Sequence, residues 1–197
     1  MKAGLVALVV VVLVVVAALG WVVSTGNAFV ARDQAVREAW AQVQNVYQRR
    51  ADLIPNLVET VKGFAAQERA VLEEVTRARA SVAGMQVTPE LLRDPDALRK
   101  FQEAQAQLGG ALGRLLAVVE RYPDLKSNQN FLALQNQLEG TENRIVVERR
   151  RYNDAVRGYN TAIRRFPGSV VASLRGFAER PYFEATAGTE TPPAIKF

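Results

Sequence analysis

Residues 128–166 read NQNFLALQNQLEGTENRIVVERRRYNDAVRGYNTAIRRF, and this stretch decides the fold. Large apolar side chains recur in it at steps of seven, as Phe131, Leu138, Ile145, Tyr152, Tyr159 and Phe166. A sustained step of seven keeps one stripe facing a neighbouring helix and implies left-handed supercoiling. A helix of this length measures about 60 Å, at roughly 1.5 Å per residue. The stretch therefore predicts a long helix that packs against other helices and stops at Pro167-Gly168.

Three stretches upstream repeat the helical pattern. Apolar residues in 98–122 alternate steps of three and four, with Gln105 as a polar interruption. Apolar residues in 57–82 also share one helical face. The first stretch, 36–54, runs up to Pro55, which predicts either an interruption there or a first-turn position in the next helix.

Strand-like alternation is nearly absent, so the predicted fold class is all-α. We expect a single N-terminal transmembrane helix, then a long antiparallel bundle of about four helices, a short C-terminal helix and a tail. Residues 84–95 are expected to form a loop between helices. The predicted boundaries are 1–25 for the anchor, 26–168 for the bundle, 169–185 for a short helical cap and 186–197 for a flexible or docking tail.

The membrane anchor is predicted at residues 3–23, AGLVALVVVVLVVVAALGWVV, which carry no charge. About 20 apolar residues span the hydrocarbon core of a bilayer as a helix. Trp21 falls at the end of the run, where membrane interfaces favour aromatic residues. The alternative is a cleaved secretory signal, with Lys2 as its basic start and a poor cleavage site at 26–28. The run exceeds the usual apolar region of about 7–15 residues in such signals, so we expect an uncleaved anchor.

The composition excludes several classes of enzyme. The chain has no Cys and no His, which rules out disulfides, thiolate nucleophiles, Cys/His zinc sites and Ser-His-Asp relays. The obvious carboxylate pairs are Glu73-Glu74 and Glu139 with Glu142. A carboxylate-only site for a hard cation stays open as an alternative, but we expect no catalytic residue, no metal and no cofactor.

Positive charge gathers near the C-terminal end of the chain. Residues 144–180 hold nine Arg against three acidic residues, a net charge of +6. Because Arg binds phosphate bidentately, this segment is a candidate for anionic-lipid contacts. The candidate residues are Arg149, Arg150, Arg151, Arg164 and Arg165. A solvated helix face paired with acids is the alternative, and no nucleic-acid partner is expected because no binding motif accompanies the charge.

Two further candidate regions concern protein docking. Polar residues surround two expected helix junctions, which would share one end of an antiparallel bundle. They are Arg49, Arg50, Asp52, Asn56, Asp124, Asn128 and Asn130. Capping of the following helix is the alternative role for Asn128 and Asn130. The tail residues Pro192, Pro193, Ile195 and Phe197 are candidates for contact with a neighbouring subunit, because an isolated terminal Phe favours burial.

Several blocks of the sequence resemble the LemA family of bacterial membrane proteins. They are RRADLIPNLVETVKGFAAQE (49–68), VTRARA (75–80), LLAVVERYPDLKSNQNFLALQNQLEGTENRI (115–145), RYNDAVRGYNTAIRRFP (151–167), RPYFEA (180–185) and the terminal PPAIKF. The resemblance covers residues 28–197. The chain departs from the family pattern in its long Val-rich anchor and in its 20 Arg against five Lys.

The resemblance implies one N-terminal membrane helix followed by a helical bundle, and it brings no catalytic residues. Together with the anchor it places the chain in the bacterial cytoplasmic (inner) membrane, as a single-pass protein. A small excess of Arg after the anchor favours a cytoplasmic bundle. The expected function is a membrane-anchored scaffold or adaptor that acts by self-association, as a homo-oligomer, and by docking membrane or membrane-associated proteins. The alternative is a lipid-sensing or membrane-remodelling protein that uses the Arg-rich fourth helix.

Overall fold

The regular structure of this chain is helical. The computed structural model describes residues 2–85 and 92–184, and every element within those two ranges is a helix. The prediction of an all-α chain is confirmed. The middle of the predicted loop at 84–95, and the tail residues Pro192, Pro193, Ile195 and Phe197, lie outside the described residues.

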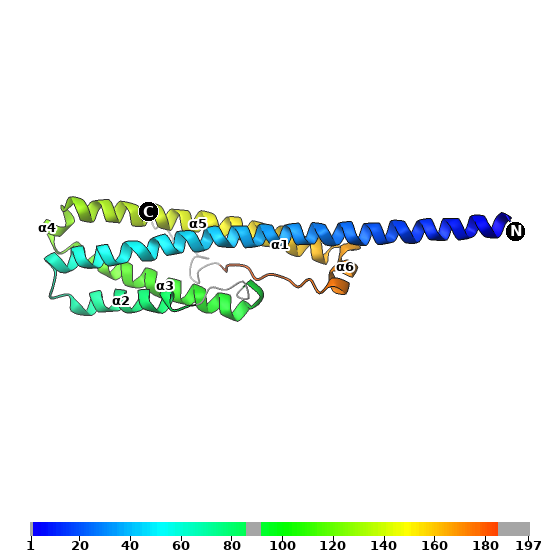
Figure 1. Ribbon diagram of the computed structural model, residues 1–197. Helices are drawn as coiled ribbons and strands as arrows, with labels where there is room; N and C mark the ends of the chain where they lie inside the picture. Colours follow the sequence, from blue (N-terminus) through cyan, green and yellow to red (C-terminus); the bar gives the residue numbers. More distant parts are fainter. Residues whose placement is uncertain (1, 86–91, 185–197) are drawn as a thin grey trace, which may run out of the picture.

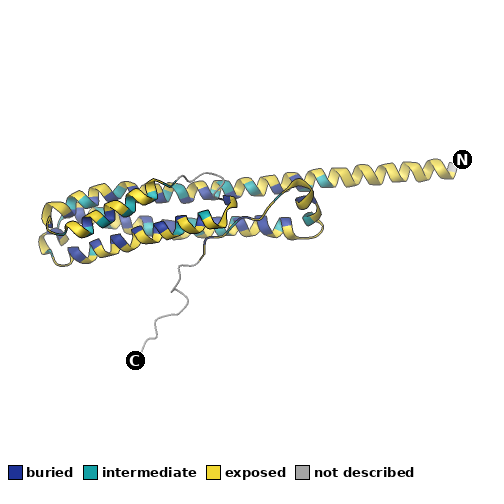
Figure 2. Ribbon diagram, turned by 90° about the horizontal axis from the view of Figure 1, so that it is seen from below, coloured by how far each residue is buried: buried dark blue, intermediate teal, exposed yellow. Residues whose placement is uncertain are grey.

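Helix α1, Lys2–Phe64, dominates the shape of the molecule at 63 residues (Figure 1). It is the one described helix that is long and apolar enough to cross a membrane, judged by length and composition. Its residues 3–21 are exposed and project beyond every other helix (Figure 2). Residues 3–23 are called the apolar stretch below. The rest of α1, with α2 to α6, is called the body, and its ends are called proximal or distal by their distance from this stretch.

The predictions of an interruption at Pro55 and of a helix that begins there are wrong, because α1 continues through it to Phe64. Proline has no N–H, so the carbonyl of Ala51, four residues earlier, loses its helical donor. The side chain of Arg79, on the next helix, supplies a donor: its Nε lies 3.0 Å from that oxygen. The chain reverses instead at residues 65–68.

Helices α2 (Arg69–Ala83), α3 (Pro95–Val119) and α5 (Gln129–Arg164) lie along α1 (Figure 1). The single-turn α4 (Pro123–Lys126) precedes α5, and the short α6 (Gly168–Arg175) follows it. The chain direction reverses between α1 and α2, between α2 and α3, and again, through α4, between α3 and α5. Asp94 and Asn128 begin α3 and α5 by accepting hydrogen bonds from the free N–H groups of the first turn.

Helix α6 ends at Gly176, whose φ of 71° is strained for residues with a side chain. This turn sends the chain back along α5. Residues 177–184 follow it without helical structure and are called the strap. The predicted cap at 169–185 is therefore helical only as far as Arg175.

The core of the body has two parts. The proximal cluster is rich in aromatic side chains: Phe29, Trp40, Tyr47, Phe101, Tyr152, Tyr159 and Phe183, with aliphatic neighbours. The distal cluster is built from Leu, Ile, Val and Ala, with Phe131 as its aromatic residue. Buried Arg50, Gln105 and Thr141 lie between them. The predicted polar interruption at Gln105 is thus a buried layer that divides the core.

The step of seven in α5 predicts the core well up to its last member. Its first five members, Phe131, Leu138, Ile145, Tyr152 and Tyr159, are buried. Phe166 is 80% exposed, so its predicted burial is wrong. It lies beyond the end of α5 at Arg164, where the chain turns towards α6 and the helical spacing no longer applies.

Candidate docking site on helix α5

Two asparagines of α5 hold the strap through hydrogen bonds to its backbone. Asn160 donates from Nδ2 to the carbonyl of Arg180 and accepts from the N–H of Arg180, both at 2.9 Å. Asn153 makes the same pair of bonds with the backbone of Phe183, at 3.0 and 2.9 Å. Each amide therefore satisfies both hydrogen-bonding groups of one strap residue.

Two tyrosines next to these asparagines add a second row of bonds. The hydroxyl of Tyr152 donates to the carbonyl of Pro181, and that of Tyr159 donates to the carbonyl of Ala178, each at 3.0 Å. Burial raises the pKa of both tyrosines, against smaller lowering effects that include the charge of Arg180. Both hydroxyls therefore stay protonated, as donors, across physiological pH.

The contacts form a repeat because helix and strap have matching rises. The Tyr-Asn pairs 152–153 and 159–160 are seven residues apart, and each kind of contact advances by three strap residues. Seven helical residues rise about 10.5 Å, and three extended residues about 10 Å. Seven residues of α5 therefore span about the same length as three residues of the strap. This arrangement is called the Tyr-Asn ladder.

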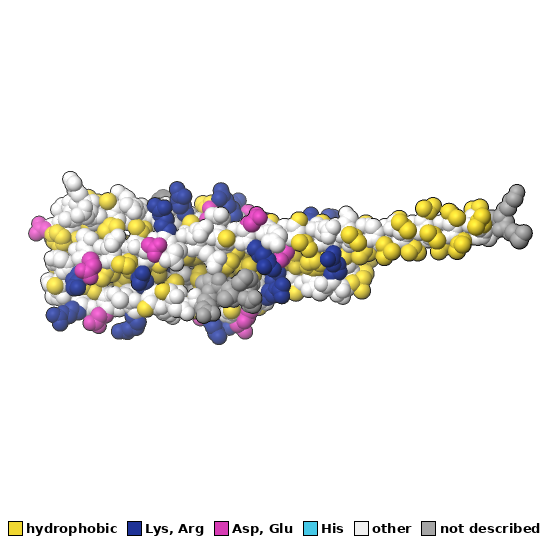
Figure 3. Space-filling model, viewed as in Figure 1, with side chains coloured by type: hydrophobic (Ala, Val, Ile, Leu, Met, Phe, Trp, Pro, Cys, Tyr) yellow, Lys and Arg dark blue, Asp and Glu magenta, His cyan; other side chains and the backbone are white. Residues whose placement is uncertain are grey.

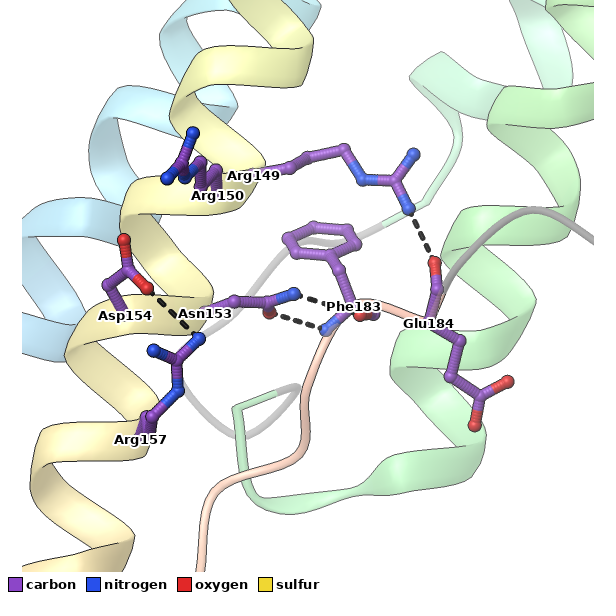
Figure 4. Close-up of a pocket in the computed structure, with 7 residues that line it drawn as sticks. All are labelled: Arg149, Arg150, Asn153, Asp154, Arg157, Phe183 and Glu184. Carbon is purple, nitrogen blue, oxygen red and sulfur yellow. Dashed lines mark hydrogen bonds and ion pairs between the residues drawn. The ribbon is translucent and has the colours of Figure 1, made fainter. Parts of the chain in front are cut away.

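Side chains of the strap fill two specific places. The buried Phe183 ring lies 5.7 Å from that of Trp40 and 5.2 Å from that of Tyr152, measured between centroids. The guanidinium of Arg149 covers Phe183 at 4.8 Å, and its Nη2 donates to the carbonyl of Glu184 at 2.8 Å (Figure 4). Backbone bonding is thus combined with selection for an aromatic side chain.

The second place takes the guanidinium of Arg180. Its Nη2 and Nε lie 2.6 and 3.0 Å from Oδ1 of Asp33 on α1. Burial by itself would raise the pKa of Asp33. Hydrogen bonds and charge from Arg180 and Arg37 outweigh it and hold that pKa below its usual value. The ion pair joins the strap to α1 as well as to α5.

A cavity of about 380 Å³ lies beside the ladder (Figure 4). Its lining includes Arg149, Arg150 and Arg157, together with Phe183 and Glu184 of the strap. Arg157 pairs with Asp154 at 3.1 Å. The described residues contain no group of three or more acidic side chains placed to hold a metal ion. The chemistry of this site is backbone hydrogen bonding, aromatic packing and positive charge.

The structure does not gather the predicted docking residues at one end, because α1 has no junction at Pro55. Arg50 is buried, with Nη1 2.7 Å from Oε1 of Glu142 and Nη2 bonded to the side chain of Gln105. Asn128 lies 14 residues before Glu142 on the α5 side, a distance of about 21 Å along a helix axis. Asn128 caps α5, which is the alternative role given for it in the sequence analysis. The other predicted residues, Arg49, Asp52, Asn56, Asp124 and Asn130, are exposed.

The candidate lipid contacts also fall at two levels. Tyr152, next to Arg149, Arg150 and Arg151, meets Trp40, which is 19 residues or about 28 Å beyond Trp21 along α1. Charge is screened within about 8 Å at physiological salt, so those three arginines are remote from the apolar stretch. Arg165, in contrast, lines a groove with Trp21 itself.

One feature of the sequence corresponds to the ladder, but the step of seven predicts only core packing for it. The dipeptide Tyr-Asn occurs twice at a step of seven, at 152–153 and 159–160. The step of seven predicts that both tyrosines pack in the core, and both are buried. Their hydroxyls and the adjacent amides have a second role that spacing alone does not show, since it depends on where the strap runs.

The chain is similar to known proteins over most of its length. The model of the LemA family matches residues 39–197. Magnetosome protein MamQ of Magnetospirillum gryphiswaldense is 29% identical over 182 residues, covering 84% of this chain and 67% of that protein. Protein LemA of Metamycoplasma hominis is 24% identical over 156 residues, covering 79% of this chain and 67% of that protein. The chain belongs to the LemA family.

Proposed function

We propose that this protein is a membrane-anchored helical scaffold that acts by self-association and protein docking and has no catalytic activity of its own. The observation that carries the proposal is the Tyr-Asn ladder. It binds an extended segment through the backbone of Arg180 and Phe183, and such bonds need no particular side chain. A site of this kind accepts a chain segment from any source that supplies the two anchoring side chains.

Rigidity supports a scaffold role. The apolar stretch and the body share helix α1, with no linker between them. A helix of 63 residues is about 95 Å long, at roughly 1.5 Å per residue. A docking site on α5 is therefore held at a fixed distance from the membrane that the apolar stretch enters.

Self-association would occur by exchange of straps between two copies. A strap from a second copy presents the same backbone groups, the same Arg180 and the same Phe183. Within one chain the strap is favoured by its high effective concentration, so exchange needs copies crowded together. Confinement to one membrane supplies that crowding. The tail residues 186–197 follow the strap and would accompany it to the neighbour.

The test uses the Cys-free background of the chain. Gln102 and Glu184 meet at the edge of the ladder, where the amide N–H of Glu184 lies 3.2 Å from Oε1 of Gln102. Two differently tagged full-length chains, one with Gln102→Cys and the other with Glu184→Cys, are co-expressed in bacterial membranes and oxidised. A disulfide that joins the two differently tagged chains is expected. Its absence, when a doubly substituted chain crosslinks internally, would exclude strap exchange.

A matched pair controls for random collision. Glu59, on distal α1, is exposed, with 71% of its side chain accessible. Chains with Glu59→Cys and Glu184→Cys should crosslink far less than the first pair. The masses of detergent-extracted protein with and without residues 186–197 complete the test. A strictly monomeric intact chain would contradict self-association.

A further inference from the structure

Helix α6 carries an apolar face that no described residue covers. Val170 is 50% exposed and Leu174 75% exposed, and their spacing of four places them on one side of the helix. The opposite side, with Val171 and Ala172, is buried in the proximal core. Phe166, just before α6, is 80% exposed. These three large exposed apolar side chains lie within nine residues and are together called the patch; grouped exposed apolar side chains can mark interaction or membrane sites.

Helix α6, which carries the patch, lies beside α1 where the apolar stretch enters the body (Figure 1). The Phe177 ring, after α6, packs edge-on against Phe29 of α1, with 5.4 Å between centroids. Gly26 faces the guanidinium of Arg175 so closely that a Cβ there would clash with it. Gly26 is only three residues beyond the apolar stretch. Helix α6 is therefore held at the level expected for the membrane surface.

A groove of about 300 Å³ adjoins the patch, between α1 and the end of α5. Trp21 and Phe166 line it together with Arg32 and Arg165. The structure records no ion pair for Arg32 or Arg165 within the described residues. Figure 3 shows basic side chains on the body near the point where the apolar stretch leaves it.

The acidic groups around this groove are already engaged. Asp33 pairs with Arg37 and Arg180, at 3.0 and 2.6 Å. Glu179 lies 3.5 Å from Arg164. The two arginines of the groove thus present uncompensated charge beside aromatic and aliphatic surface, an arrangement that fits an anionic amphiphile.

We propose that this region is a binding site for anionic phospholipid. In it, Arg32 and Arg165 take the headgroup phosphate, while Phe166, Val170 and Leu174 enter the interfacial layer of the same leaflet. Guanidinium groups match phosphate geometry, and a juxtamembrane Arg gains about 1 kcal/mol from an anionic surface. Apolar faces of interfacial helices are buried about 5–10 Å into the headgroup boundary. The inference rests on the membrane-anchoring part of the proposed function and is independent of strap exchange.

Such a site would set the orientation of the body. The apolar stretch alone leaves the direction in which the helix axis tilts from the membrane normal free. Seating α6 on the membrane surface favours tilt towards the side of α1 that carries α6, because α1 is continuous into the body. That side of the body then leans towards the membrane.

The first test measures depth in the bilayer. Full-length chains with Val170→Cys or Leu174→Cys carry an environment-sensitive dye in nanodiscs of phosphatidylcholine with about 30% phosphatidylglycerol. Lipids with a spin label near the headgroup should quench both sites. The control is Val146→Cys near the middle of α5, which is 67% exposed and should be unquenched. No quenching at 170 and 174, or equal quenching at 146, would overturn the proposal.

One further labelled position separates this failure from failure of the anchor. Val12→Cys, inside the apolar stretch, should be quenched by a spin label deep in the acyl chain. If Val12 is quenched and Val170 is not, the protein is anchored and the interfacial site is wrong. If neither is quenched, the membrane-anchoring premise fails, and this proposal fails with it.

The second test addresses the phosphate. Phosphatidylglycerol retained by the detergent-purified chain is counted by native mass spectrometry, for wild type and for Arg32→Gln/Arg165→Gln. A loss of about five-fold per arginine is expected. The matched control, Arg150→Gln/Arg151→Gln, changes two arginines remote from the apolar stretch and should retain the lipid. Equal loss in both pairs would assign the binding to net charge and overturn the specific site.

Discussion

The proximal and distal halves of the body solve the same packing problem with different residues. In the distal half, α1, α2, α3 and α5 pack through Leu, Ile, Val and Ala side chains. In the proximal half the strap packs with α5 and α1, where α2 no longer reaches. A non-helical segment brings unpaired N–H and C=O groups that must find partners when buried. Tyrosine and asparagine supply those partners, which is why aromatic and amide residues replace aliphatic ones.

A polar layer separates the halves. Arg50 bonds to both Gln105 and Glu142 between the two clusters, and among the described residues Arg50 Nε and Gln105 Nε2 have no hydrogen-bond partner. Buried unsatisfied groups oppose close packing across the layer. Damage in one half should therefore leave the other half largely intact.

The largest expected effect comes from Trp40→Ala. Trp40 is buried and contacts the rings of Phe101, Tyr152 and Phe183. Truncation of such a residue costs about 3–5 kcal/mol in the free energy of unfolding. It also removes one wall of the Phe183 pocket, so the strap should detach. Denaturant unfolding in detergent and protease cleavage within residues 177–184 measure the two effects.

Two control variants test whether the two halves unfold independently. Trp21→Ala changes the other tryptophan, which is 43% exposed, and should leave both readouts nearly unchanged. Leu108→Ala opens a cavity in the distal core at a cost of about 2–5 kcal/mol but should leave the strap protected. If Leu108→Ala released the strap as readily as Trp40→Ala, the two halves would be one cooperative unit.

The sequence predicts the helices because their apolar spacing is local information. The core positions of α3 and α5 follow from steps of three, four and seven, from Leu98 to Tyr159. Pro55 leads to a wrong prediction because the residue that compensates for it, Arg79, lies on another helix, 28 residues from the Ala51 carbonyl that it serves. The ladder could not be predicted for the same reason. Tyr152 and Pro181 are 29 residues apart, and the sequence of neither segment indicates that the other packs against it.

The next largest effect is expected from Asn160→Leu, which keeps the side-chain size and removes the amide. The backbone N–H and C=O of Arg180 then lose their partners in a buried position. Loss of partners for buried polar groups costs about 1–3 kcal/mol. Hydrogen exchange of residues 177–184 should rise strongly. Asn143→Leu, at an exposed position of the same helix, should change neither exchange nor stability.

A smaller effect is expected from acid. The pKa of Asp33 is below its unfolded value near 3.9, so its ionised form stabilises the native state. This contribution is complete above the unfolded pKa and is lost as pH falls through the folded pKa. A dye at Glu184→Cys should therefore report strap release in the acid range below about pH 4. In Asp33→Asn that acid transition should disappear, and an unchanged transition would assign it to other carboxylates.

The smallest expected effect tests the distal half alone, at the bond between Arg79 and the Ala51 carbonyl. Arg79→Met removes the donor that replaces the missing N–H of Pro55, at a cost of about 0.5–1.5 kcal/mol. In a Pro55→Ala background an N–H at position 55 restores the helical bond to Ala51, so the same change at 79 should cost almost nothing. A double-mutant cycle by denaturant unfolding gives the coupling. Arg77→Met, at an exposed neighbouring position, should show none. Additive effects of Pro55 and Arg79 would mean that α1 tolerates its proline without help from α2.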